Sequence, residues 1–185
     1  MRLAFILCSV LLLGACAGRS GPVSYYLLEA MAPAAAEAQS SATIRLLPVE
    51  LADYLRRTAL VSRQGGLLLI DDGQQWAGTL EDEVTRVMVT NLNRIAGGVQ
   101  VQPSTAPDRP ALALQLRIDR LDGVLGGALR LEGAFTLVDE RNDVVALRLF
   151  TISRPAGATI AELVEAHSLA LADLAAAIAP LLPRS

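Results

Sequence analysis

The spacing of apolar residues changes along this chain and divides it into strand-like and helix-like segments. Apolar and polar residues alternate over residues 111–119 and 128–139, which predicts two strands that each present one apolar face. Residues 143–153 are apolar on both faces, which is typical of a central or covered strand. Short turn-forming segments separate the three, so we expect them to form an antiparallel meander.

More strands are predicted in the first third of the chain. Residues 24–30 are aromatic and aliphatic and favour a first strand. Residues 43–51 indicate a strand that Pro48 interrupts, and a proline there places the strand at a sheet edge or makes it end. Residues 59–71 contain two apolar runs around a Gly-Gly pair, which predicts a hairpin.

Two segments have helical periodicity. Between Trp76 and Ile95 apolar residues recur mostly every three or four positions, and acidic residues gather near the start, where the helix dipole favours them. Residues 159–182 repeat the pattern and end near Pro180. We therefore predict an α+β domain, a mostly antiparallel sheet of about five or six strands with two amphipathic helices packed on one face.

The first residues have the character of an export signal. Arg2 precedes an apolar run over residues 3–13, which is shorter than the roughly 20 residues that span a bilayer. Leu13-Gly14-Ala15-Cys16 follows and resembles a bacterial lipobox. An ordinary secretory signal, with the cysteine present by chance, is the alternative.

The lipobox resemblance implies that Cys16 is acylated and becomes the mature N-terminus. It divides the chain into a signal peptide (1–15), a flexible tether (16–24) and one domain (25–185). Ala17 stands where an aspartate would indicate retention in the inner membrane. By resemblance to sorted lipoproteins, we expect a lipid-anchored protein on the periplasmic face of the outer membrane.

Composition narrows the function further. The formal charge is −3, and removal of Arg2 with the signal makes it −4. All sixteen basic residues are arginines, and this mildly acidic balance argues against nucleic-acid binding, which needs clustered positive charge. Cys8 would leave with the signal and Cys16 would carry lipid, so no disulfide is expected within one mature chain.

Candidate catalytic chemistry is sparse. His167, the only histidine, lies on the apolar stripe of the last predicted helix and has no neighbouring ligands at metal-site spacing. No GxSxG motif is present, and Ser168 only adjoins the histidine on a helix. We predict no enzyme activity, metal or cofactor, and interpret His167 as a boundary residue with one hydrogen bond.

The loop sequence "YLRR", Tyr54 to Arg57, is a better candidate for a functional contact. Arg56 and Arg57 could meet lipid phosphate or an acidic partner, because guanidinium groups bind both in bidentate fashion. A solvated loop is the alternative. Trp76, the only tryptophan, is placed at the start of the first predicted helix and is more typical of a core anchor than of a ligand contact.

The order of several segments resembles one family. "LPVELADYLRRTALVSR", "QWAGTLEDEVTRVMVTNL" and "GALRLEGAFTLVD", followed by an alanine-rich last helix, are similar to the PqiC-like lipoproteins, also described as ABC-type transport auxiliary lipoproteins. Ala52, Arg56 and Gln75 depart from the family pattern, which puts contacts through those side chains in doubt. The matching positions are Pro48, Val49, Tyr54, Leu55, Arg57, Val61, Arg63, Trp76 and Leu80.

The resemblance implies a non-catalytic lipoprotein that docks the tube of an MCE-domain protein to the outer membrane in a lipid transport system. A homo-oligomeric ring is an arrangement that this picture allows. Two alternatives stay open, namely a lipid-binding carrier module and an envelope assembly or integrity lipoprotein that binds an outer-membrane barrel or peptidoglycan. The candidates for partner or lipid contact are Tyr54, Leu55, Arg56, Arg57, Arg63 and Trp76.

Overall fold

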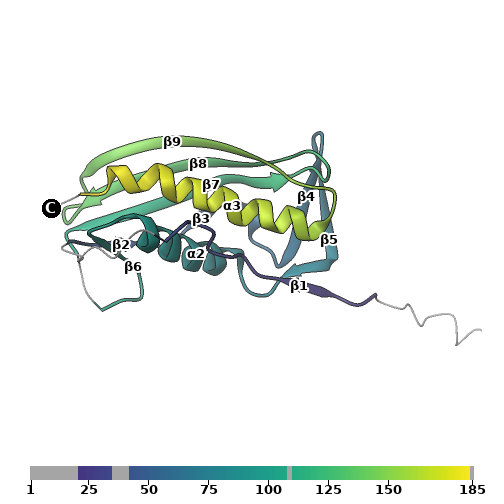
Figure 1. Ribbon diagram of the computed structural model, residues 1–185, viewed down its shortest axis with the longest axis horizontal. Helices are drawn as coiled ribbons and strands as arrows, with labels where there is room; N and C mark the ends of the chain where they lie inside the picture. Colours follow the sequence, from purple (N-terminus) through teal and green to yellow (C-terminus); the bar gives the residue numbers. More distant parts are fainter. Residues whose placement is uncertain (1–20, 35–41, 108–109, 184–185) are drawn as a thin grey trace, which may run out of the picture.

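The computed structural model describes residues 21–34, 42–107 and 110–183. Within these residues nine strands form one sheet, and helices α2 (Leu80–Ile95) and α3 (Ile160–Ile178) lie side by side over it (Figure 1). The predicted signal peptide and Cys16 lie outside the described residues, so both stay predictions.

The three longest strands form the predicted meander. β7 (Leu112–Gly123), β8 (Ala128–Asp139) and β9 (Val144–Pro155) pair in antiparallel fashion, and β9 pairs with β8 alone among the described strands. The apolar alternation found in the sequence corresponds to the face that the helices cover. Leu114, Leu116 and Ile118 of β7 are buried there.

The other side of β7 is lined by one strand broken into three pieces. β2 (Ala42–Leu46), β3 (Glu50–Leu51) and β4 (Ala59–Gln64) follow one another along β7, each parallel to it. Pro48 lies in the first break, outside both flanking strands, as the missing N–H of proline requires. The second break contains the short 3₁₀-helix η2 (Asp53–Leu55), which carries most of the YLRR loop.

The remaining strands extend the sheet on this side. β6 (Val99–Pro103) pairs parallel with β2 after the chain has crossed through α2. β5 (Leu67–Trp76) forms the predicted hairpin with β4, and β1 (Ser24–Tyr26) adds parallel to the end of β5. A second 3₁₀-helix, η3 (Ala179–Leu181), follows α3.

The α+β class and the two helices are confirmed, but the predicted sheet is wrong in size and direction. The sheet is mixed, and the pairs β1–β5, β2–β6, β2–β7, β3–β7 and β4–β7 are all parallel. Periodicity identifies a strand without identifying its neighbour, and a two-residue strand such as β3 has no period to detect.

The start of the first helix also differs from the prediction. Trp76 is the last residue of β5, and α2 begins four residues later behind Thr79, whose hydroxyl accepts a hydrogen bond from the Asp82 N–H at 3.2 Å. A threonine followed by acidic residues is the usual N-cap arrangement. The apolar spacing ran continuously from strand into helix and concealed this boundary.

Helix α3 is a core helix. The segment Ile160–Leu181 is 22 residues long and apolar enough, by length and composition, to cross a membrane. In the folded domain, however, ten of the α3 side chains are buried. Their burial in the domain core explains the apolar composition.

Buried polar side chains of the two helices hold the chain that follows β1. The Leu28 N–H donates to Glu83 Oε2 at 3.1 Å, and the Ala32 N–H donates to Asn91 Oδ1 at 2.9 Å, both on α2. Ser168 Oγ of α3 accepts from the backbone N–H next to Leu28, at position 29. These polar groups satisfy backbone donors that would otherwise lose water on burial.

Candidate functional site

A β-bulge turns one carboxylate to the face of the sheet opposite the helices. Register shifts between Ile118 and Arg120, so Asp119 is the extra residue of β7. Before the bulge the even-numbered side chains of β7 face the core, and after it Leu121 does. Asp122 therefore points to the outer face, where the YLRR loop lies.

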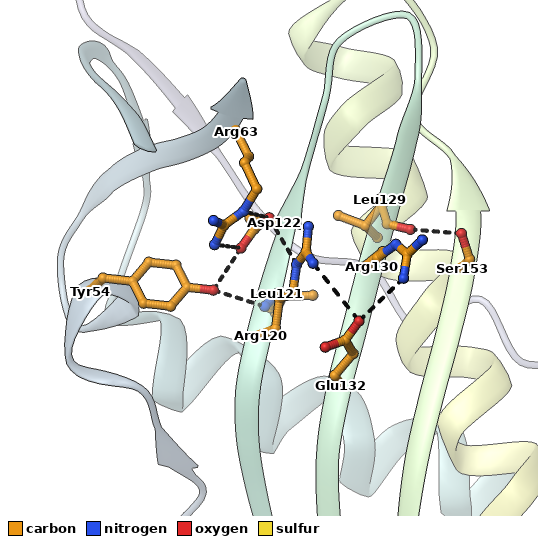
Figure 2. A network of polar contacts seen from close by, with 9 residues as sticks. All are labelled: Tyr54, Arg63, Arg120, Leu121, Asp122, Leu129, Arg130, Glu132 and Ser153. Atoms are coloured by element: carbon orange, nitrogen blue, oxygen red, sulfur yellow. Dashed lines mark hydrogen bonds and ion pairs between the residues drawn. The ribbon is translucent and has the colours of Figure 1, made fainter. Parts of the chain in front are cut away.

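Asp122 is the centre of a polar network (Figure 2). Arg63 of β4 donates two hydrogen bonds to its carboxylate, from Nε to Oδ1 at 2.7 Å and from Nη2 to Oδ2 at 2.9 Å. The Tyr54 hydroxyl donates to Oδ2 at 2.7 Å, and Arg120 Nε donates to Oδ1 at 3.2 Å. The Asp122 side chain is 0 % exposed, so these partners replace its water completely.

The network shifts the pKa of its members. Burial alone would raise the pKa of Asp122, but the hydrogen bonds from Arg63 and Tyr54 and the charge of Arg120 outweigh it and lower that pKa below its usual value. Burial and the hydrogen bond to Asp122 raise the pKa of Tyr54 to about 12. The same carboxylate raises the pKa of Arg63. Asp122 is therefore an anion and Tyr54 a neutral phenol at neutral pH.

Further ion pairs continue the network across the sheet. Glu132 of β8 lies between two cations, with its Oε1 3.9 Å from Arg120 Nη1 and 3.6 Å from Arg130 Nη1 (Figure 2). The Tyr54 oxygen also accepts the Leu121 N–H at 3.4 Å. The whole arrangement joins η2, β4, β7 and β8, and its charges are directed at one another. The network therefore fixes the YLRR loop to the sheet.

The six predicted contact residues divide into three groups: two bond to Asp122, two are buried in the core and two are exposed at the surface. Tyr54 and Arg63 are engaged with Asp122, and the side chains of Leu55 and Trp76 are buried in the core. Trp76 meets His167 edge to face, with ring centroids 5.4 Å apart. A partner could reach Leu55 or Trp76 only after the core had opened.

His167 belongs to the core as well, and its interpretation as a boundary residue is wrong because it is 1 % exposed. Its Nδ1 lies 2.7 Å from the Leu163 carbonyl oxygen, one turn back on α3. Burial lowers the pKa of the imidazole, so it is neutral at neutral pH. Among the described residues, no group of three or more His, Cys, Asp or Glu side chains is placed to hold a metal ion.

Arg56 and Arg57 present their charge at the surface. Arg56 Nε donates to the Leu51 carbonyl at 3.1 Å, and its ion pairs with Asp53 and Glu81 are long, at 3.9 Å each. The Arg56 side chain is 55 % exposed. Arg57 Nε donates to the Tyr54 carbonyl at 2.8 Å, and the residue is exposed. These bonds orient the two side chains without neutralising them.

A hollow of about 630 Å³ adjoins Arg56 on the outer face of the sheet. The connection between β2 and β3 forms one wall, Arg117 of β7 lies on another, and Leu147 of β9 lies at the far side. Beyond the hollow, Val145 and Leu149 of β9 are exposed. The YLRR loop therefore borders a recess lined by Arg56, Arg117 and Glu50 together with polar and apolar side chains.

Sequence reasoning identified Tyr54 and Arg63 but missed Asp122, Arg120 and Glu132. A signal was present, because the apolar positions of β7 switch from even numbers up to Ile118 to the odd-numbered Leu121. Such a switch of parity within one strand is typical of a bulge. It would have predicted an outward-facing Asp122.

A family model described as "ABC-type transport auxiliary lipoprotein component" matches residues 26–179, nearly all of the described domain. The chain belongs to this family. The resemblance to PqiC-like lipoproteins is thereby confirmed, and the family's auxiliary role in transport is that of a component rather than of the transporter itself. No curated protein matches the chain.

Solved structures similar to this family member agree in fold. An uncharacterized protein covers 88% of this chain and 100% of its own, with a TM-score of 0.75 and 20% sequence identity. Protein XCC0632 from Xanthomonas campestris, a DUF330 protein, covers 85% of this chain and 93% of its own, with a TM-score of 0.71 and 20% identity. At this identity the likeness shows the fold alone.

Proposed function

We propose that this family member is a non-catalytic lipoprotein that is anchored in the outer membrane through Cys16 and docks the tube of an MCE-domain protein there. The observation that carries the proposal is the family match over nearly all of the described domain, since the family is an auxiliary component of ABC-type transport. The system would move lipids between the two membranes, and this protein would hold its outer end.

The division of the YLRR loop supports a docking role. Tyr54 and Arg63 fasten the loop to Asp122, and Arg56 and Arg57 are presented by it at the surface. A fixed loop with exposed arginines suits recognition of carboxylates on a partner, because little side-chain and backbone freedom remains to be lost on binding. We assign the MCE-domain contact to Arg56, Arg57 and the hollow beside them.

The test is capture of the partner from membranes through a defined point of contact. The full-length, lipidated protein would carry a photo-crosslinking amino acid at Arg56, and the crosslinked products would be identified by mass spectrometry. The same amino acid at Arg141, an exposed arginine in the turn between β8 and β9, is the matched control. We expect an MCE-domain protein from the Arg56 position and a much weaker product from Arg141.

Other products would decide between the alternatives. An outer-membrane barrel or a peptidoglycan-binding protein, in place of the MCE-domain protein, would support an envelope-assembly role and overturn docking. Crosslinks to lipid alone would indicate a carrier module. A Cys16→Ala variant that still fractionates with the outer membrane would contradict the proposed anchor.

A further inference from the structure

One end of the molecule gathers exposed apolar side chains. The first half of β5 exposes three of them directly after the turn of the β4–β5 hairpin, and Leu67 is 60 % exposed. Two more follow the end of β7, while Tyr25 of β1, 65 % exposed, stands apart because it pairs with Gln75 near the opposite end of β5. We call the five side chains on β5 and after β7 the end patch, and its members are Leu67, Leu69, Ile70, Val124 and Leu125.

Strand pairing brings these segments together. Ser62 of β4 pairs with Leu69 on one side and with Gly123, the last residue of β7, on the other. β1 pairs with the last residues of β5, where Ser24 lies opposite Gln74. Figure 1 shows the β4–β5 hairpin, the end of β7 and the start of β1 at one end of the molecule.

The exposed side chains of the end patch do not stabilise the folded domain. Large apolar side chains that stay in water contribute little to the free energy of folding, and contiguous groups of them mark contacts with proteins or membranes. The end patch also differs from the core face of the sheet, where Leu129 and Leu131 are fully buried. The end patch is therefore a candidate contact surface, as is the row of exposed apolar side chains on β9 that includes Val145 and Leu149.

The length of the chain before β1 indicates what the end patch contacts. Cys16 precedes Ser24, the first residue of β1, by eight residues, so their Cα atoms are at most about 29 Å apart even in a fully extended chain. An acyl group on Cys16 holds the start of β1 within that reach of the bilayer. The end of the domain that carries the end patch is the end that the anchor brings to the membrane.

We infer that the end patch is a membrane-contact surface, which inserts its apolar side chains into the interfacial region of the leaflet that holds the Cys16 lipid. The inference rests on the proposed lipid anchor and is independent of the MCE-domain partner.

The charges around the end patch specify the kind of lipid. Asp71 and Asp72 follow Ile70 directly and are exposed, while Arg63 of the same hairpin is paired with Asp122. The charges next to the patch on β5 are therefore acidic, so attraction of this strand to anionic headgroups does not supply the affinity. Burial of apolar area does, so contact with zwitterionic lipid should persist when the salt concentration is raised.

The decisive experiment measures depth at single positions. Cys16 is acylated in this proposal and Cys8 is removed with the signal, so an introduced cysteine is the only free thiol. Leu67→Cys and Leu125→Cys variants of the full lipidated protein would carry an environment-sensitive fluorophore in phosphatidylcholine vesicles, with or without nitroxide-labelled lipid. Leu149→Cys, on β9 and 78 % exposed, is the matched control for an exposed leucine elsewhere.

We expect the labels at positions 67 and 125 to emit at shorter wavelength and to be quenched by nitroxide lipid, and the label at 149 to remain aqueous. Flotation of the vesicles reports the anchor separately. Protein that floats with all three labels unquenched would overturn the membrane contact and leave the lipoprotein proposal intact. Shifted emission without lipid quenching would assign the end patch to a protein contact and overturn it too. Failure to float would overturn both proposals.

Discussion

Two arginines of one short segment show how differently the same side chain can be used. Arg63 makes two hydrogen bonds of 2.7 and 2.9 Å to a carboxylate with no exposed surface. Arg56 lies 3.9 Å from Asp53 and from Glu81, and more than half of its side chain is in water. The first contact holds the fold together, and the second leaves a charge available for a partner.

The largest loss of unfolding free energy is expected when Asp122, the carboxylate that Arg63 and Arg120 share, is removed. Asp122→Ala leaves Arg63, Arg120 and Tyr54 without their acceptor, and removal of one partner from a buried pair costs about 3–5 kcal/mol of unfolding free energy. Urea denaturation measures the loss. Asp119→Ala, which removes a half-exposed carboxylate from the same strand, should cost much less. Equal losses would contradict the central role of Asp122.

Acid should remove the same contribution reversibly. The folded pKa of Asp122 is lowered, so its stabilisation is complete above the ordinary carboxyl pKa of about 4 and is lost as the pH falls through the folded value. The difference in unfolding free energy between the parent and Asp122→Asn should therefore be constant near neutral pH and shrink below about pH 4. Denaturant titrations at several pH values check this. A gap that does not change with pH would show that ionisation is irrelevant.

The phenol is expected to matter less. Tyr54→Phe removes one hydrogen bond to a charged acceptor and keeps the ring, so a loss of about 1.5 kcal/mol is expected. Thermal and urea unfolding of the purified domain measure it. Tyr25→Phe, at an exposed tyrosine, is the matched control and should be neutral. A neutral Tyr54→Phe would mean that the two arginines satisfy Asp122 alone.

Arg56 should give the smallest change in stability. Arg56→Glu alters an exposed side chain with only long ion pairs, so the unfolding free energy should move by about 0.5 kcal/mol or less. Recovery of the MCE-domain protein in a pull-down should nevertheless fall, because the charge at the proposed contact is reversed. Arg141→Glu serves as the control with the same charge change. A loss of stability as large as that of Asp122→Ala would contradict the different roles assigned to Arg56 and Arg63.

The sequence was sufficient for the parts of the molecule whose pattern is local. The meander, the β4–β5 hairpin and the last helix were all predicted from periodicity and turn residues. The parallel course of β2, β3 and β4 along β7 was not, because strand partners far apart in sequence leave no periodic trace in a single chain.

The site was predicted in the same uneven way. Tyr54 and Arg63 were recognised as motif positions, but their role depends on Asp122, 59 residues beyond Arg63 and turned outward by a bulge. Trp76 was expected at a helix start and instead closes β5 against His167. A motif records which residues matter, and only the fold shows whether they hold the chain or are offered to a partner.

The hydrogen bonds that hold the chain after β1 to helix α2 affect how the domain bears mechanical load. A pull on the proposed lipid anchor would enter the domain through β1, which lies parallel to β5 and pairs with it at Gln74, Gln75 and Trp76. A force along β1 acts across these pairs together, in shear, so they resist as a group. Behind them, the bonds from Leu28 and Ala32 to α2 pass the tension into the helices. In the proposed docking role, the domain would thus be loaded through its core rather than through a loose end.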